Sequence, residues 1–158
     1  GFAEMYLNNE NIEKQIRTLE VSNFVSKVAE VSEVRAKLVE QQQEMGKNKG
    51  IVMDGRDIGT VVFPEAELKL FMNASSKTRA QRRFDELIEK GQHVTFEEVF
   101  HNVEERDYID THREDSPLVK AADAIEIDNS AMSKTEQFEL VLKLVKEKIN
   151  KLKYIFKK

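Results

Sequence analysis

The chain has 158 residues, a length typical of one domain with a hydrophobic core. Its net charge of −4 and pI near 5.5 disfavour a general nucleic-acid binder, which usually presents a basic face, and no apolar run approaches the ~20 residues needed to cross a membrane. The absence of cysteine excludes disulfides and thiolate metal sites, and it favours a cytoplasmic protein.

The first part of the chain predicts a hairpin followed by two helices. Residues 5–7 are strand-like and precede a turn signal at 8–11. Apolar residues then recur at helical spacing from 20 to 45, with a break where Ser32 is expected to cap a second helix beginning near Glu33. The apolar residues expected to form the packing faces of these helices are Val21, Phe24, Val25, Val28, Val34 and Leu38.

After a loop at 46–50, the chain alternates strands with helices. The apolar run at 51–53 is typical of a buried parallel strand. Pro64 ends the next segment, and a second strand is expected at 68–72. Alternating strands and helices predict an α/β fold in which helices flank a parallel sheet.

Capping signals define three further helices. Ser75 or Ser76 can cap a helix over 77–90 that stops at Gly91. The later expected elements are a helix from the Thr95–Glu98 capping box to about Thr111, a strand at 124–128, and a final helix after the Ser133–Glu136 capping box. The final helix has an apolar stripe of Phe138, Val141, Leu142, Val145, Ile149 and Leu152. We expect this stripe to pack on the core.

The residues that follow the first parallel strand indicate a ligand site. Ligands in open α/β sheets bind just past the carboxyl ends of strands, where Asp54, Arg56 and Asp57 are expected. Gly55 and Gly59 would let the backbone approach the ligand closely. One arginine between two acids suits a ligand with a phosphate and a polar base, so we interpret the segment as a nucleotide site. A tight turn without a ligand is the alternative.

Other phosphate-binding and nucleophile motifs are absent from the sequence. Gly50 and Gly55 have the glycine spacing of a P-loop, but Arg56 and Asp57 stand where that motif requires Lys and Ser or Thr. No Gly-x-Ser-x-Gly motif is present either. Phosphoryl transfer needs no covalent nucleophile, because positioning and charge neutralisation supply most of its catalysis.

Arginine is confined to the chain up to Arg113, after which every basic residue is lysine. Because the planar guanidinium binds phosphate oxygens at two points, this distribution indicates anion binding. Arg106, Asp110 and Arg113 share one helix face. They would either hold a phosphate and a sugar or form a solvated ion pair worth only ~0.3–0.5 kcal/mol. From this triplet alone, the solvated ion pair is the favoured interpretation. A second cluster, equally consistent with a solvated face or a phosphate-covering lid, comprises Arg79, Arg82 and Arg83.

Short motifs spread from about residue 14 to 130 occur in one order that is specific to a kinase family. They are Gln15–Thr18, Glu20–Ala29, Val34-Arg35, Asp54–Pro64, Asn73–Ser76, Glu105–Asp107 with Asp110 and Arg113, Ser116–Val119 and Ala121–Ala124. With these motifs the chain resembles bacterial cytidylate kinases, which are P-loop nucleoside monophosphate kinases.

The resemblance implies roles for the matching residues. The residues implied to read the cytosine base are Ser26, Arg35 and Asp57. Those implied to clamp phosphate and act in catalysis are Arg56, Arg106 and Arg113, with Asp110 on the sugar. Asp54 is implied to orient Mg²⁺ through water, and Arg17 to lie near the monophosphate. The residues implied to form a lid over ATP are Arg79, Arg82 and Arg83.

The resemblance also implies a domain organisation. Residues 1–46 would be a small α+β monophosphate-binding insert, and 47–158 the core α/β portion with a helical lid at about 76–113. The family's opening strand and P-loop have no counterpart here, so we expect the C-terminal portion of such a kinase, inactive alone. The parent would transfer phosphate from ATP, with Mg²⁺, to CMP or dCMP. The alternatives are a non-catalytic nucleotide-binding fragment and an interaction module.

Overall fold

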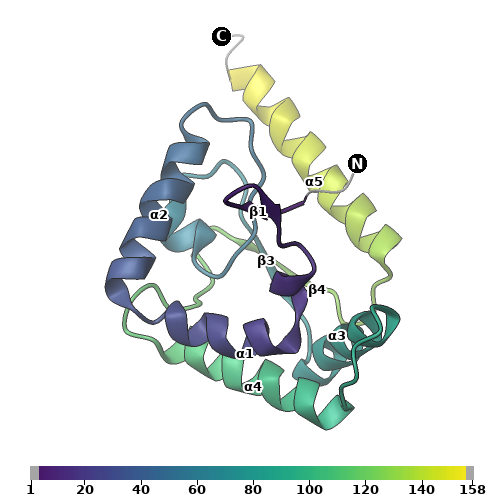
Figure 1. Cartoon of the computed structure of the whole chain (residues 1–158). Helices are drawn as coiled ribbons and strands as arrows, with labels where there is room; N and C mark the ends of the chain where they lie inside the picture. Colours follow the sequence, from purple (N-terminus) through teal and green to yellow (C-terminus); the bar gives the residue numbers. More distant parts are fainter. Residues whose placement is uncertain (1–3, 156–158) are drawn as a thin grey trace.

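A computed structural model describes residues 4–155, which form a helix-rich α/β structure with two small sheets (Figure 1). The strands are β1 (Tyr6–Leu7), β2 (Glu10–Asn11), β3 (Leu70–Asn73) and β4 (Ile125–Asp128). The α-helices are α1 (Leu19–Val28), α2 (Ser32–Gly46), α3 (Ser76–Glu89), α4 (Phe96–His112) and α5 (Lys134–Ile155). Two short helical segments are η1 (Gln15–Arg17) and the π-helical turn η2 (Ile58–Val62). None of the described helices is long and apolar enough to span a membrane.

The predicted hairpin is confirmed. Strands β1 and β2 pair antiparallel, with Tyr6 opposite Asn11. The two residues between them, Asn8 and Asn9, have positive φ values of 51° and 69°. Asparagine tolerates this left-handed conformation, and two such residues in succession suit the tight turn of a hairpin.

The predicted break between the first two helices is also confirmed, but the predicted cap of α2 is wrong. Val31 precedes α2 without a side-chain cap, and Ser32 is already its first residue. The Ser32 hydroxyl donates to the Asp115 carboxylate instead. A charged acceptor makes a stronger hydrogen bond than a neutral one, so the hydroxyl is used in a long-range contact.

The predicted apolar faces of α1 and α2 are exposed rather than packed. Phe24 on α1 is 66% exposed and Leu38 on α2 is 48% exposed. The side of α1 that contacts α4 instead buries two serines, Ser22 and Ser26. The hydrophobic period therefore identified the helices correctly but not the face that they bury.

The two strands predicted at 68–72 and 124–128 are present as β3 and β4 and pair in parallel, with Leu70 opposite Ile125 and Asn73 opposite Asp128. The expected buried strand at 51–53 is not formed, and Val52 is fully exposed. A strand is stabilised by backbone hydrogen bonds to a neighbour, and no described segment pairs with 51–53. This prediction was wrong because an apolar run does not reveal whether a neighbouring strand is present.

Helices α3 and α4 begin at their predicted caps, and the two helices pack together. The Ser75 hydroxyl accepts from the Thr78 backbone N–H at the start of α3, and Thr95 forms a capping box with Glu98 at the start of α4. Leu87 and Val99 are completely buried between these helices. This pair of helices forms the best-packed apolar part of the molecule and holds one side of the site in place.

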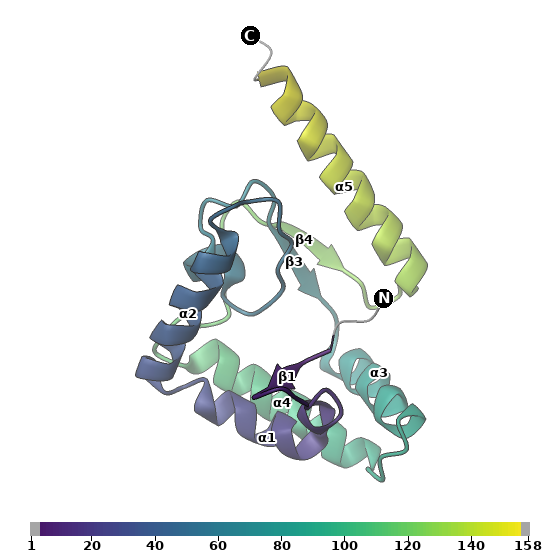
Figure 2. The ribbon, with the colours of Figure 1, turned by 45° about the horizontal axis from the view of Figure 1, so that its top comes forward.

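Helix α5 begins at the predicted Ser133–Glu136 capping box, whose three hydrogen bonds are all formed. The expected packing of its apolar stripe is only partly observed. Phe138 is 65% exposed and Ile149 is 46% exposed, whereas Val141, Val145 and Leu152 are half-buried. Figure 2 shows α5 standing away from the other helices. Part of the stripe therefore stays open among residues 4–155.

Candidate functional site

The seven side chains predicted to bind the substrate converge where α1, α2 and α4 meet the loop before η2. Figure 1 shows α1 lying along α4, with α2 and the loop at one end of this pair. The seven are Ser26 on α1, Arg35 on α2, Arg56 and Asp57 in the loop, Arg106 and Asp110 on α4, and Arg113 at the end of α4. Hydrogen bonds and ion pairs connect neighbouring members of this set, which we call the arginine cluster.

Asp57 is the carboxylate nearest to α2 in the arginine cluster. It is 7% exposed, and its Oδ2 accepts a 2.7 Å hydrogen bond from Arg35 Nη1. Arg35 Nε donates to the Ala29 carbonyl at 2.9 Å, which fixes the guanidinium plane. Arg113 Nη2 lies 4.0 Å from Asp57 Oδ1. Buried charges require such partners, so Asp57 holds two arginines and the η2 loop together.

Asp110 is the second buried carboxylate and also contacts two arginines. Arg113 Nη1 donates to its Oδ1 at 3.1 Å, and Arg56 Nε donates to its Oδ2 at 3.0 Å. Burial lowers the pKa of Arg113, as does the nearby Arg35 charge, while Asp110 and Asp57 oppose this effect. The side chains of Arg113 and Asp110 are 4% and 7% exposed, so their interpretation as a solvated surface pair was wrong.

Arg106 differs from its neighbours because both of its hydrogen-bond partners are neutral. Its Nε donates to Ser26 Oγ at 3.2 Å, and its Nη1 donates to Ser22 Oγ at 2.9 Å. Burial lowers the pKa of Arg106, as do the charges of Arg56 and Arg83, while Asp110 and Asp107 oppose this effect. Among residues 4–155, no carboxylate forms an ion pair with Arg106. Arg106 is therefore a cation held by neutral groups, with which an anionic ligand could pair.

Two buried residues that are linked to this arginine, one directly and one through the other, were missed in the sequence. Ser22 is 7% exposed and donates to Asn102 Oδ1 at 3.1 Å, and Asn102 is 4% exposed. Each lies one helical turn before a predicted site residue, Ser22 before Ser26 and Asn102 before Arg106. That four-residue spacing of polar side chains was the available signal.

The three arginines predicted to cover ATP point toward different parts of the structure. Arg79 makes a bidentate contact with Asp107 on α4, at 2.8 and 2.6 Å. Arg82 donates to the Asn129 carbonyl after β4 at 2.7 Å. Arg83 bonds to Glu86 and, at 3.0 Å, to the Arg17 carbonyl. Their present contacts are with protein groups and do not converge on one point.

The two remaining predicted positions lie outside the arginine cluster. Asp54 is exposed, and the strand that was expected to position it is absent. Within the described residues, no group of three or more His, Cys, Asp or Glu side chains could hold a metal ion. Arg17 pairs with Glu13 at 2.8 Å on the surface. The roles of Asp54 and Arg17 thus stay predictions.

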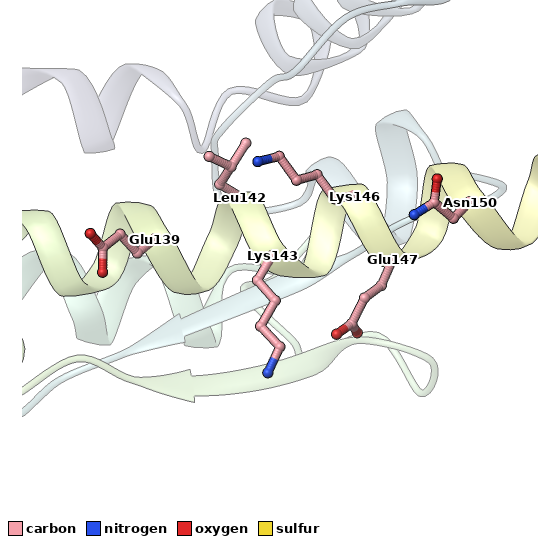
Figure 3. Close-up of a pocket in the computed structure, with 6 residues that line it drawn as sticks. All are labelled: Glu139, Leu142, Lys143, Lys146, Glu147 and Asn150. Atoms are coloured by element: carbon pink, nitrogen blue, oxygen red, sulfur yellow. The ribbon is translucent and has the colours of Figure 1, made fainter.

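Two surface hollows also lie away from the arginine cluster. Figure 3 shows one on a single face of α5, where side chains leave the helix in different directions and do not converge on a point. Its lining residues are Glu139, Leu142, Lys143, Lys146, Glu147 and Asn150. A second hollow lies between the start of α1 and residues 91–94. Neither has the buried, connected charges of the arginine cluster.

Comparison with known proteins relates this arrangement to one family. The family model described as cytidylate kinase matches residues 1–147. The chain is 78% identical over 147 residues to a cytidylate kinase of Flavobacterium johnsoniae, covering 93% of this chain and 64% of that protein. It is 58% identical over 139 residues to a cytidylate kinase of Bacteroides thetaiotaomicron, covering 88% of this chain and 61% of that protein. The chain therefore spans less than two thirds of the length of these relatives.

Proposed function

The chain belongs to the cytidylate kinase family, and we propose that its protein transfers the γ-phosphoryl group of ATP to CMP or dCMP, giving CDP or dCDP. The finer fold that we propose is that of a P-loop kinase, with residues 1–46 as the monophosphate-binding insert. Within this chain, we propose that the arginine cluster is the monophosphate site. A cytoplasmic location fits the absence of cysteine.

The observation that carries the proposal is the charge imbalance at Arg106. This half-buried guanidinium is held by the hydroxyls of Ser22 and Ser26 and has no carboxylate partner among the described residues. Arg56 pairs with Asp110, which lies one turn after Arg106 on α4, so a second positive charge belongs to the same cluster. A phosphate placed between them would supply the missing negative charge through charge-assisted hydrogen bonds.

The other members of the arginine cluster suit the sugar and the base. Asp110 is fixed by Arg56 and Arg113, and we propose that its carboxylate accepts from a ribose hydroxyl. The Arg35–Asp57 pair presents a donor and an acceptor at one place, which can match the polar edge of cytosine. Ser26 lies on the same side, next to Arg106. These roles would place the phosphate of CMP at Arg106 and Arg56.

The proposed reaction depends on positioning and charge. A phosphate oxygen of CMP forms a bond to the γ-phosphorus of ATP, while the bond to the leaving ADP oxygen breaks. Arg56 and Arg106 would orient the attacking phosphate and offset the charge that accumulates during transfer. Bound Mg²⁺ would neutralise phosphate charge, with Asp54 as the carboxylate that we propose for it, because Mg²⁺ takes many of its ligands from phosphates and water.

A lid role for α3 is also a proposal. Arg79, Arg82 and Arg83 would have to exchange their present partners for ATP phosphates when the lid closes. The contact of Arg82 is exposed and should cost little to exchange, whereas those of Arg79 and Arg83 are partly buried and should cost more. Closure would exclude water that could otherwise accept the phosphoryl group.

Calorimetry on the 158-residue chain tests the proposed monophosphate site. We expect CMP to bind, cytidine to bind much more weakly because it lacks the phosphate, and AMP to bind weakly because its base differs. Kinase activity of the whole protein, measured with CMP and ATP, tests the reaction. Binding of CMP without turnover would favour the non-catalytic nucleotide-binding alternative, and failure of a folded chain to bind any nucleotide would favour an interaction module.

A further inference from the structure

The hydroxyl of Ser22 has only one possible hydrogen-bonding arrangement. Arginine has donors and no acceptor, so Ser22 Oγ must accept from Arg106 Nη1, at 2.9 Å. The hydroxyl proton of Ser22 must then point to a different group. Asn102 Oδ1, 3.1 Å away, is the acceptor that receives it. The three residues therefore form a directed chain from Arg106 through Ser22 to Asn102.

The side-chain amide of Asn102 is itself held in one orientation. Its Nδ2 donates to Asn23 Oδ1 at 2.5 Å, so its Oδ1 is directed to Ser22. Asn102 is 4% exposed and lies one turn before Arg106 on α4, while Ser22 and Asn23 lie on α1. The amide therefore connects the two helices that carry the phosphate-binding arginine and its hydroxyl partners.

We propose that Asn102 is a positioning residue, which acts through Ser22 to hold Arg106 in the orientation that binds the CMP phosphate. This inference rests on the proposed function of Arg106. Without the Asn102 acceptor, the Ser22 hydroxyl loses the contact that turns its lone pair toward Arg106 Nη1. Arg106 would then be held through Ser26 alone and would sample orientations that do not face the phosphate.

The first test replaces Asn102 by leucine, which has a similar size but no acceptor. We expect Asn102→Leu to bind CMP roughly tenfold more weakly, the loss typical of one buried hydrogen bond. Binding of cytidine should be unchanged, because cytidine has no phosphate for Arg106 to contact. In the whole protein, KM for CMP should rise while KM for ATP is unaffected.

A double-mutant cycle separates positioning from a general loss of stability. Ser22→Ala should weaken CMP binding about as much as Asn102→Leu, and the double variant should be no weaker than either. Additive losses would mean that Asn102 acts independently of Ser22 and would overturn the inference. Unchanged CMP affinity in Asn102→Leu would also overturn it, while CMP binding by the wild-type chain would leave the proposed function intact.

A spectroscopic measurement covers the case in which the leucine variant does not fold. The Nη1–H signal of Arg106 in a ¹⁵N NMR spectrum, assigned by its loss in Arg106→Lys, should exchange slowly with water in the wild-type chain, because Nη1 donates to Ser22 Oγ. Asn102→Asp keeps an acceptor for Ser22 and should retain this signal, whereas Ser22→Ala should lose it. Rapid exchange of the signal in the wild-type chain would overturn the inference. If the wild-type chain binds no CMP, the proposed function fails, and the inference fails with it.

Discussion

The arginine cluster and the surface around α5 differ in what they bury. In the arginine cluster, charged and polar side chains such as Asp57, Asp110 and Arg113 are less than a tenth exposed, and each has partners. On α5, large apolar side chains such as Phe138 and Ile149 are exposed. The usual distribution of polar and apolar residues is therefore reversed between the two regions.

The difference shows which interactions are complete within the described chain. Each of the two buried carboxylates finds its arginines on elements that are present, namely α2, α4 and the loop before η2. An apolar stripe needs an apolar surface opposite, and on α5 only the part with Val141, Val145 and Leu152 is half-buried. The site can therefore be organised even though the apolar surface around α5 and residues 51–53 is open.

The largest effect that we expect comes from breaking the buried charges. Asp57→Ala removes the carboxylate shared by Arg35 and Arg113, and loss of one partner from a buried ion pair costs about 3–5 kcal/mol. Urea unfolding of the chain measures this loss. Glu40→Ala is the control, because Glu40 pairs with Lys37 on the surface of α2, where both side chains are more than half exposed, and should change stability little. Equal effects of the two variants would contradict a structural role for the arginine cluster.

The next largest effect separates binding from stability within the arginine cluster. Arg106→Ala should weaken CMP binding and kcat/KM for CMP by roughly 10²–10³-fold, because a charge-assisted phosphate contact is lost. Its unfolding free energy should change little, since no described carboxylate depends on Arg106. Arg106→Lys keeps the positive charge but not the planar guanidinium, so its CMP affinity should lie between those of the wild type and Arg106→Ala. Near-normal kinetics in Arg106→Ala would remove Arg106 from the proposed clamp.

A smaller effect is expected at the start of α4, which carries three residues of the arginine cluster. Thr95→Ala removes the helix cap and should destabilise the chain by about 1 kcal/mol at neutral pH. Hydrogen bonds from the Thr95 backbone and hydroxyl lower the pKa of Glu98 below 4.5. Because folding lowers this pKa, ionised Glu98 stabilises the folded chain above pH 4.5, and this stabilisation is lost as the pH falls through the pKa of the folded state.

The capping box therefore predicts that this part of the variation of stability with pH is present only when Thr95 is there to bind Glu98. Wild-type chain and Thr95→Ala should become more similar in stability as the pH falls below 4.5. Thermal unfolding measured across that range checks this expectation. A difference between the two that stays constant with pH would mean that Glu98 does not contribute through the cap.

The smallest effect is expected on α5. Phe138 is 65% exposed, so Phe138→Ser should change the unfolding free energy by less than about 0.5 kcal/mol. Leu87→Ala, at a completely buried position of α3, should cost about 2–5 kcal/mol and serves as the positive control. A large loss in Phe138→Ser would show that the stripe on α5 is packed in solution and would reduce the contrast between the two regions.

Local signals predicted the elements of this fold well. The hairpin turn at Asn8 and Asn9, the Thr95–Glu98 box and the Ser133–Glu136 box all lie where the sequence placed them. The failures involve partners. The strand at 51–53 and the cap at Ser32 were wrong, and the packing of α5 was only partly right, because each depends on which distant segment lies opposite.

The arginine cluster was predicted as a set of residues but not as a network. Its seven members came from helix spacing and from the family resemblance, and the structure brings them together. Ser22 and Asn102 were missed because serine and asparagine on a helix are ordinary surface residues in sequence. Their importance follows from hydrogen bonds that exist only when α1 lies against α4.

The amino-acid sequence by itself determined where helices begin, where the chain turns and which cations are arginines. Caps and turns are made by groups three or four residues apart, so their chemistry can be read locally. Only the tertiary structure decided which arginine has a carboxylate as its hydrogen-bond partner and which has only hydroxyls as partners. Arg56 and Asp110 are 54 residues apart, and Arg106 and Ser22 are 84 apart. Contacts over such separations form only when packing brings two helices and a loop to one place.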